Sequence, residues 1–281
     1  MRDVLLRPEN IYVQIVADLY ALKNAKKPFM GTAFLPAQPA GTERKIGAPR
    51  DLKAACVFLG NAITHPSKDA TVLSLASIES SFCLAASAGI YGFGHPDSAP
   101  MLVAVELLCS IEGPMWRLIR GQGLAYGFSL YGAAEEGLVY FSLMRASNLP
   151  KAFAEARRLV GSFADGTTLI DPIALENAVA SVVSSVVSRE QTVASCGMQA
   201  MMSALRDAPP GYNQRVLGNV QAVTSEDVLR VLRQYLIQVF DPAFATLAIT
   251  TNVNKLPEVV SGFKEAGWDV TQVDSIESQV A

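Results

Sequence analysis

The stretch 111–131 (IEGPMWRLIRGQGLAYGFSLY) constrains the fold of this chain more than any other. An apolar helical run ends at Arg120 and breaks at Gly121 and Gly123, two residues that permit a tight turn. After the glycines, apolar and polar residues alternate, which predicts a strand carrying Tyr126. Arg120 and Tyr126 therefore lie on opposite sides of one helix-to-strand turn. Both side chains can donate hydrogen bonds to the same carbonyl or oxyanion.

The rest of the chain predicts an α+β fold. Alternating or β-branched runs predict strands at 72–76, 80–90, 124–131, 138–146 and 244–251, the third and fourth of these forming a hairpin. A cap at Asp97, a capping-box pattern at Thr224 and Asp227, prolines and helical periodicity indicate where helices form. The predicted helices span 97–111, start at 148 and at 171, and span 192–206, 224–239 and 256–266. This order of elements predicts a largely antiparallel sheet with helices packed on one face.

Composition shifts divide the chain into three parts. Residues 1–35, with a strand pattern at 10–17, are predicted to be the remnant of a preceding domain that ends in its closing strand. Residues 36–50 are rich in proline, glycine and charge, which is typical of a linker. Residues 51–281 are predicted to form the α+β domain. We expect the chain to be one part of a longer protein or a separately encoded half.

The string RGQGLAYG, preceded by EGPMW, resembles the C-terminal half of the pitrilysin/insulysin family of zinc metallopeptidases. The branch that it resembles most is the presequence-protease-like one, and weaker likeness extends from about Asp69 to Ile249. The resemblance implies the LuxS-like metallohydrolase fold of that family. It also implies that Arg120 and Tyr126 bind substrate opposite a zinc site, with Arg117 as the second choice.

A purely structural interpretation of the same residues stays open. An arginine at a helix C-terminus is favoured by the helix dipole, and a tyrosine on a strand is commonly half-buried. Gly121 and Gly123 are most simply turn residues, and a close approach of a peptide to their backbone is compatible with that role.

The histidines exclude a catalytic zinc site made by this chain alone. Only His65 and His95 are present, each followed by proline, and neither stands in an HxxEH or HExxH arrangement. No cofactor is therefore expected here. The resemblance implies that zinc and the catalytic glutamate belong to an N-terminal half, which would be the partner of this chain together with an unfolded peptide substrate.

Composition excludes two other classes of partner. The net charge is −3 and no dense basic stripe occurs, so nucleic acid is not expected as a ligand. The sequence contains no run of eighteen apolar residues, so no membrane span is predicted. The four cysteines Cys56, Cys83, Cys109 and Cys196 are scattered in apolar or small surroundings. This pattern favours buried free thiols and an intracellular location, cytoplasmic or mitochondrial.

These observations lead to one functional hypothesis and one alternative. The first is the C-terminal, non-zinc-binding half of a zinc metalloendopeptidase, which forms a wall of the substrate chamber and holds peptide through an Arg/Tyr pair. The isolated chain is then inactive. The alternative is a catalytically inactive member of the same family that serves as a scaffold or binding subunit.

Overall fold

The computed structural model of the protein describes residues 16, 69–206, 208–209 and 211–275. The chain separates into two compact units. The larger unit contains 53–186 and 211–281, and the smaller one contains 1–52 and 187–210. The domain boundaries predicted at 35 and 50, and the linker between them, lie outside the described residues.

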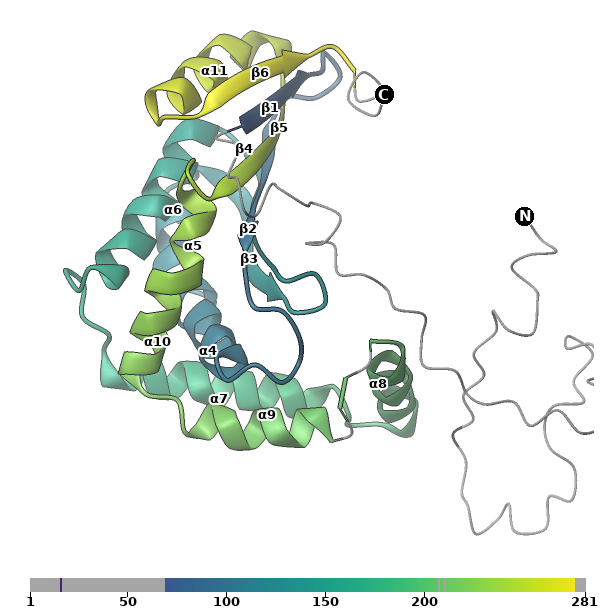
Figure 1. The fold of residues 1–281 in the computed structure, drawn as a ribbon. Helices are drawn as coiled ribbons and strands as arrows, with labels where there is room; N and C mark the ends of the chain where they lie inside the picture. Colours follow the sequence, from purple (N-terminus) through teal and green to yellow (C-terminus); the bar gives the residue numbers. More distant parts are fainter. Residues whose placement is uncertain (1–15, 17–68, 207, 210, 276–281) are drawn as a thin grey trace, which may run out of the picture. The chain divides into compact units, whose positions relative to one another are not determined.

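A six-stranded sheet forms the centre of the larger unit (Figure 1). Its strand order is β3-β4-β2-β5-β1-β6. The pairs β3–β4, β4–β2 and β2–β5 are antiparallel, whereas β5–β1 and β1–β6 are parallel. The bounds are β1 Asp69–Ser74, β2 Ser81–Ala88, β3 Ala125–Ala133, β4 Leu138–Ala146, β5 Ala245–Thr251 and β6 Asp269–Val273. The predicted α+β fold with a largely antiparallel sheet is confirmed.

Helices cover one face of this sheet. Its other face exposes side chains such as Leu84 and Met144, while their strand neighbours Ala85 and Leu143 are buried beneath the helices. The helices with all or most of their residues in the larger unit are α4 Ser98–Cys109, α5 Pro114–Ile119, α6 Leu149–Ala164, α7 Pro172–Ser188, α9 Tyr212–Gln221, α10 Ser225–Val231 and α11 Leu256–Glu265. Short turns of other helix types also occur: the π-helical η4 Leu232–Leu236 and the 3-10 segments η5 Gln238–Phe240 and η6 Val253–Lys255.

An aromatic cluster joins the sheet to its helical layer. The ring centroid of Phe153 on α6 lies 5.9 Å from that of Phe141 on β4 and 5.4 Å from those of Phe240 and Phe263. Trp268 adds an edge contact at 6.1 Å. All five side chains are buried, so this cluster fixes α6 and α11 against the sheet.

The smaller unit contributes one described helix, α8 Val193–Leu205. Thr192 caps it by accepting a hydrogen bond from the Ser195 backbone N–H at 3.1 Å, and the Ser195 hydroxyl accepts one from the Thr192 N–H at 3.0 Å. This reciprocal capping box explains why the helix begins where the sequence predicts it.

Local capping signals identified other helix starts correctly. The capping box predicted at Thr224 and Asp227 is present, and Asn148 caps α6 by accepting a hydrogen bond from the Lys151 N–H. Asp97 precedes α4 as predicted, but its carboxylate makes no capping hydrogen bond. Its side chain is instead bonded to Arg230.

Two elements were not predicted from the sequence. Helix α9 reads YNQRVLGNVQ, whose polar residues and internal glycine weaken the helical signal. Strand β6 has only five residues and lies at the edge of the sheet, where it pairs with β1. Each residue of β6 pairs with a residue of β1 that lies 200 positions earlier, a long-range contact that local pattern does not encode.

Candidate functional site

The turn between α5 and β3 is a Schellman motif. The Leu124 N–H donates to the Ile119 carbonyl at 2.9 Å, and the Gly123 N–H donates to the Arg120 carbonyl at 3.0 Å. Gly123 has the left-handed φ of +68° that this motif requires. Ile119 and Leu124 are both buried, as the hydrophobic contact of the motif demands. The last turn of α5 is therefore tightly fixed to the start of β3.

Gly121 is required for a different reason. A Cβ atom at this position would lie 2.5 Å from the Arg117 carbonyl oxygen, which is backbone and cannot rotate away. A Cβ at Gly123 would meet no atom within 4 Å, so that position is restricted by its backbone angle alone. Both glycines thus have a structural reason to be glycine.

The turn brings Arg120 and Tyr126 together. The Arg120 guanidinium carbon lies 4.9 Å from the centroid of the Tyr126 ring, which is within cation–π range. Arg120 is exposed at the end of α5, and Tyr126 is 61% exposed at the start of β3. We refer to these two residues as the Arg–Tyr pair. Its hydrogen-bonding groups are available to a ligand.

Arg145, which was not predicted from the sequence, lies beside this pair. Arg145 on β4 has its guanidinium carbon 5.6 Å from the same Tyr126 ring centroid. Ala125 pairs with Ala146 and Gly127 pairs with Met144, so Tyr126 and Arg145 lie opposite each other across the hairpin. The sequence predicts the hairpin but not its register, and the register is what places Arg145 opposite Tyr126.

Arg117, the second choice from the sequence, lies on the exposed surface of α5. Unlike Arg120 and Arg145, it has no ring contact with Tyr126 among the contacts of the described residues. The structure therefore brings Arg120, Gly123 and Tyr126 together in one turn and adds Arg145, while Arg117 stands one helical turn away.

The surroundings of the Arg–Tyr pair are positively charged. Within the described part of the chain, no carboxylate forms an ion pair with Arg117, Arg120 or Arg145. The Lys255 ammonium donates to the Ser147 carbonyl at 3.1 Å, and the Ser147 hydroxyl donates to the Gly123 carbonyl at 2.7 Å. These bonds connect η6, the end of β4 and the turn. The resulting surface favours carbonyl or anionic groups of a ligand.

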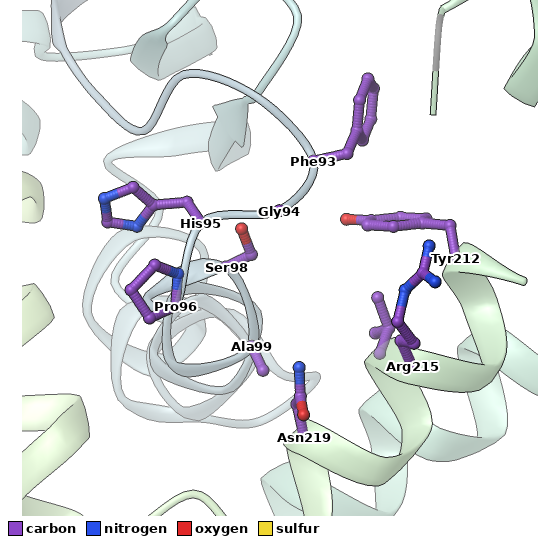
Figure 2. Close-up of a pocket in the computed structure, with 10 residues that line it drawn as sticks. Phe93, Gly94, His95, Pro96, Ser98, Ala99, Tyr212, Arg215 and Asn219 are labelled. Atoms are coloured by element: carbon purple, nitrogen blue, oxygen red, sulfur yellow. The ribbon is translucent and has the colours of Figure 1, made fainter. Parts of the chain in front are cut away.

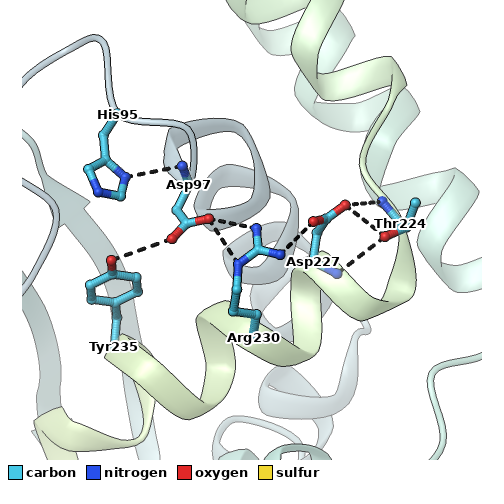
Figure 3. A network of polar contacts seen from close by, with 6 residues as sticks. All are labelled: His95, Asp97, Thr224, Asp227, Arg230 and Tyr235. Atoms are coloured by element: carbon cyan, nitrogen blue, oxygen red, sulfur yellow. Dashed lines mark hydrogen bonds and ion pairs between the residues drawn. The ribbon is translucent and has the colours of Figure 1, made fainter.

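A separate polar network holds α4 against α10 (Figure 3). The Arg230 guanidinium donates to the buried Asp97 carboxylate at 2.6 and 3.1 Å, and the Tyr235 hydroxyl donates to it at 3.4 Å. The Asp97 N–H donates to His95 Nδ1 at 3.1 Å. Each residue of this network is hydrogen-bonded to another of its members, which favours a structural role.

His95 also lines a small pocket between the start of α4 and helix α9 (Figure 2). The pocket has a volume of about 220 Å³ and is lined mainly by Phe93, Pro96, Ser98, Tyr212 and Arg215. This volume is below the roughly 300–1,000 Å³ of typical small-molecule sites. The pocket therefore does not compete with the Arg–Tyr pair as the main candidate site.

Metal ligation finds no support in the described residues. They contain no group of three or more His, Cys, Asp or Glu side chains placed to hold a metal ion. His65 lies outside the described residues. Among the described helices, none is both long and apolar enough to cross a bilayer.

Comparison with curated proteins finds distant relatives that have no assigned function. An uncharacterised protein of Schizosaccharomyces pombe is 27% identical over 220 residues, which are 76% of this chain and 21% of that protein. An uncharacterised protein of Saccharomyces cerevisiae is 27% identical, covering 66% of this chain and 18% of its own length. One of Caenorhabditis elegans is 25% identical, covering 68% and 19%. The chain thus spans about a fifth of the length of these relatives, and no family model matches it.

Solved structures show what the fold is similar to. The inactive domain of an M16 peptidase from Pseudomonas fluorescens superposes with a TM-score of 0.55 at 15% identity, covering 67% of this chain and 44% of that one. A protease from Helicobacter pylori gives 0.56 at 14%, covering 66% and 45%. The inactive peptidase domain of a putative zinc protease from Bordetella parapertussis gives 0.51 at 17%, covering 62% and 94%. The chain therefore has the fold of M16 peptidase domains.

Proposed function

We propose that this chain is the C-terminal, non-zinc-binding part of a zinc metalloendopeptidase of the pitrilysin family, in its presequence-protease-like branch. The shared fold with domains described as inactive in M16 peptidases supports the proposal. The observation that carries it is the Arg–Tyr pair, two exposed hydrogen-bond donors held together by a rigid turn. Zinc and the catalytic glutamate would belong to the N-terminal half of the same protein.

In this proposal the chain forms one wall of the substrate chamber and holds an unfolded peptide. The Arg120 guanidinium lies over the Tyr126 ring, and its N–H groups would donate to a peptide carbonyl. The Tyr126 hydroxyl is a second donor. Closing the chamber would exclude water and strengthen both interactions, as in an oxyanion hole. The free thiols of the described cysteines fit an intracellular site of action, in the cytoplasm or mitochondria.

The proposal predicts a loss of turnover larger than the loss of stability. In the full-length protein that contains this chain, Arg120→Ala should lower kcat/KM by roughly 100- to 1000-fold, since losing one oxyanion-type donor costs about 2.7–4 kcal/mol of barrier. Tyr126→Phe should also lower kcat/KM, because it removes the hydroxyl donor. The aromatic ring stays in place, so the loss would come from the hydroxyl alone. Melting temperatures should change little, since both side chains are exposed.

Arg157→Ala is the matched control, because Arg157 is an equally exposed arginine on α6 that is not a member of the site. Its variant should keep full turnover. Wild-type kcat/KM in Arg120→Ala would overturn the peptide-binding role and leave a helix-terminal arginine with a structural role only.

A catalytically inactive scaffold or binding subunit is the second candidate, favoured by the lack of any HxxEH motif in this chain. Zinc analysis of the full-length protein separates the two. One tightly bound zinc per chain with chelator-sensitive peptide cleavage supports the peptidase. Peptide binding with neither zinc nor cleavage supports the scaffold.

A further inference from the structure

Two guanidinium groups share the ring of Tyr126. The Arg120 guanidinium carbon lies 4.9 Å from the ring centroid and that of Arg145 lies 5.6 Å from it. Each arginine comes from a different element, Arg120 from the end of α5 and Arg145 from β4. An aromatic ring can attract a cation to each of its two faces, while two like charges that share one ring also repel each other.

Among the described residues, no carboxylate balances the charge of these two arginines. No carboxylate in that part of the chain forms an ion pair with Arg120 or Arg145. By contrast, Arg158 and Arg230 each have a carboxylate partner at 2.7 Å or closer. The two arginines at Tyr126 therefore present donors that an incoming anion can use, and such an anion would lower the repulsion between them.

The backbone of Arg145 lies in a β-bulge of β4, because β2 pairs Ser81 with Ala146 but Cys83 with Leu143. Its φ is +52°, in the left-handed region that is unfavourable for residues with a Cβ atom. Glycine would relieve this strain, and asparagine tolerates it better than arginine does. A β-bulge changes the direction of a side chain, and this one accompanies an Arg145 guanidinium carbon that lies 5.6 Å from the Tyr126 ring centroid.

We infer that Arg145 binds a carboxylate of the peptide substrate while the Arg–Tyr pair holds a backbone carbonyl nearby. The inference rests on the proposed peptide-binding function and adds the class of substrate, namely peptides with an anionic group next to the bound segment. Both guanidiniums lie within 6 Å of one ring centroid. The carboxylate therefore lies within about three residues of the bound carbonyl, because an extended chain advances about 3.4 Å per residue.

Two chemical sources can supply this carboxylate: the C-terminus of the peptide or an acidic side chain. The test uses fluorescent peptides of one sequence that are either neutral or carry a single carboxylate. One pair compares a free C-terminal acid with its amide, and the other compares an internal glutamate with glutamine in amidated peptides. Fluorescence anisotropy measures their binding to the 281-residue chain.

We expect one of the two pairs to differ by roughly tenfold in Kd for the wild-type chain, as for one hydrogen-bonded charged group. The pair that differs identifies the source. Arg145→Gly and Arg145→Asn should both abolish the difference, and neither should lower the melting temperature, since each relieves the φ of +52°. Tyr126→Phe keeps the ring and should keep the preference, and Arg157→Ala should leave both Kd values unchanged.

The outcomes separate this inference from the proposed function. Equal Kd values for charged and neutral peptides, or an undiminished preference in both Arg145 variants, would overturn the carboxylate role while peptide binding stands. If the wild-type chain binds none of the peptides, the proposed peptide-binding function fails and this inference fails with it.

Discussion

Arg230 and Asp97 are 133 residues apart in the sequence, yet the Arg230 guanidinium lies 2.6 Å from the Asp97 carboxylate. The pair joins the N-terminus of α4 to α10 (Figure 3). The Asp97 side chain is 9% exposed and that of Arg230 is 46% exposed, so the carboxylate depends on this partner far more than the guanidinium does. This asymmetry has a measurable consequence.

Arg230→Ala should destabilise the protein by about 1–3 kcal/mol, because it leaves a buried carboxylate with only the longer bond from Tyr235. Urea unfolding measures the change. Arg158→Ala is the control, since Arg158 forms an ion pair with Glu155 of nearly equal length, 2.7 Å, on the surface of α6. That variant should lose less than about 0.5 kcal/mol. Equal losses for the two variants would contradict the role assigned to burial.

The acid end of the stability profile should depend on Asp227. Its pKa is lowered from an ordinary 3.8 to about 2, first by the Thr224 hydroxyl, then by the Thr224 N–H and by Arg230. The unfolded chain therefore takes up this proton before the folded one does. The stability that ionised Asp227 contributes to the folded state is fully present above about pH 4 and is lost as the pH falls through about 2.

Urea midpoints of wild type and Asp227→Asn, measured across this range, test the assignment. The stability difference between the two proteins should shrink as the pH falls. Thr224→Ala should reduce the slope of the wild-type profile, since it removes the largest cause of the shift. A constant difference between wild type and Asp227→Asn down to pH about 2 would contradict it.

Thiol reactivity should differ sharply among the described cysteines. Burial raises the pKa of Cys83 to about 12, and burial followed by the nearby Glu106 charge raises that of Cys109 to about 12. Cys196 is exposed. Since only the thiolate reacts, iodoacetamide should modify Cys196 in the native protein and reach the other two only after unfolding. Mass spectrometry of a Cys56→Ser variant measures this, and native labelling of Cys83 would contradict the buried position of β2.

The sequence was sufficient for the elements whose signals are local. The two glycines, the alternation after them and the caps at Asn148 and Thr224 each determine a boundary within a few residues. Arg120 and Tyr126 could be paired for the same reason, because six residues and one turn separate them.

Arg145 and the Asp97–Arg230 pair could not be found in this way. Arg145 reaches Tyr126 through the register of a hairpin, and a shift of one residue would place it on the other face of the sheet. Asp97 was predicted to be an ordinary cap, because its capping position is visible in sequence and its distant partner is not. Such contacts depend on the assembled sheet and its helical layer.

The glycines of the turn allow a test that separates a structural role from a role in peptide binding. Gly123→Ala should cost about 1–2 kcal/mol of stability, because an L-residue is unfavourable at φ +68°. Gly123→Asn should cost less and leave peptide affinity unchanged. Gly121→Ala should affect both properties, since its Cβ would lie 2.5 Å from the Arg117 carbonyl oxygen and displace the turn that carries Arg120.

Melting temperatures and peptide Kd values for the three glycine variants decide the issue. If Gly123 acts only through the turn, loss of affinity should follow loss of stability across the series. Gly123→Asn could instead keep its melting temperature and bind peptide far more weakly. That result would contradict a role through the turn alone and would mean that the peptide backbone lies directly against Gly123. The added side chain would then block the ligand, since it meets no protein atom within 4 Å.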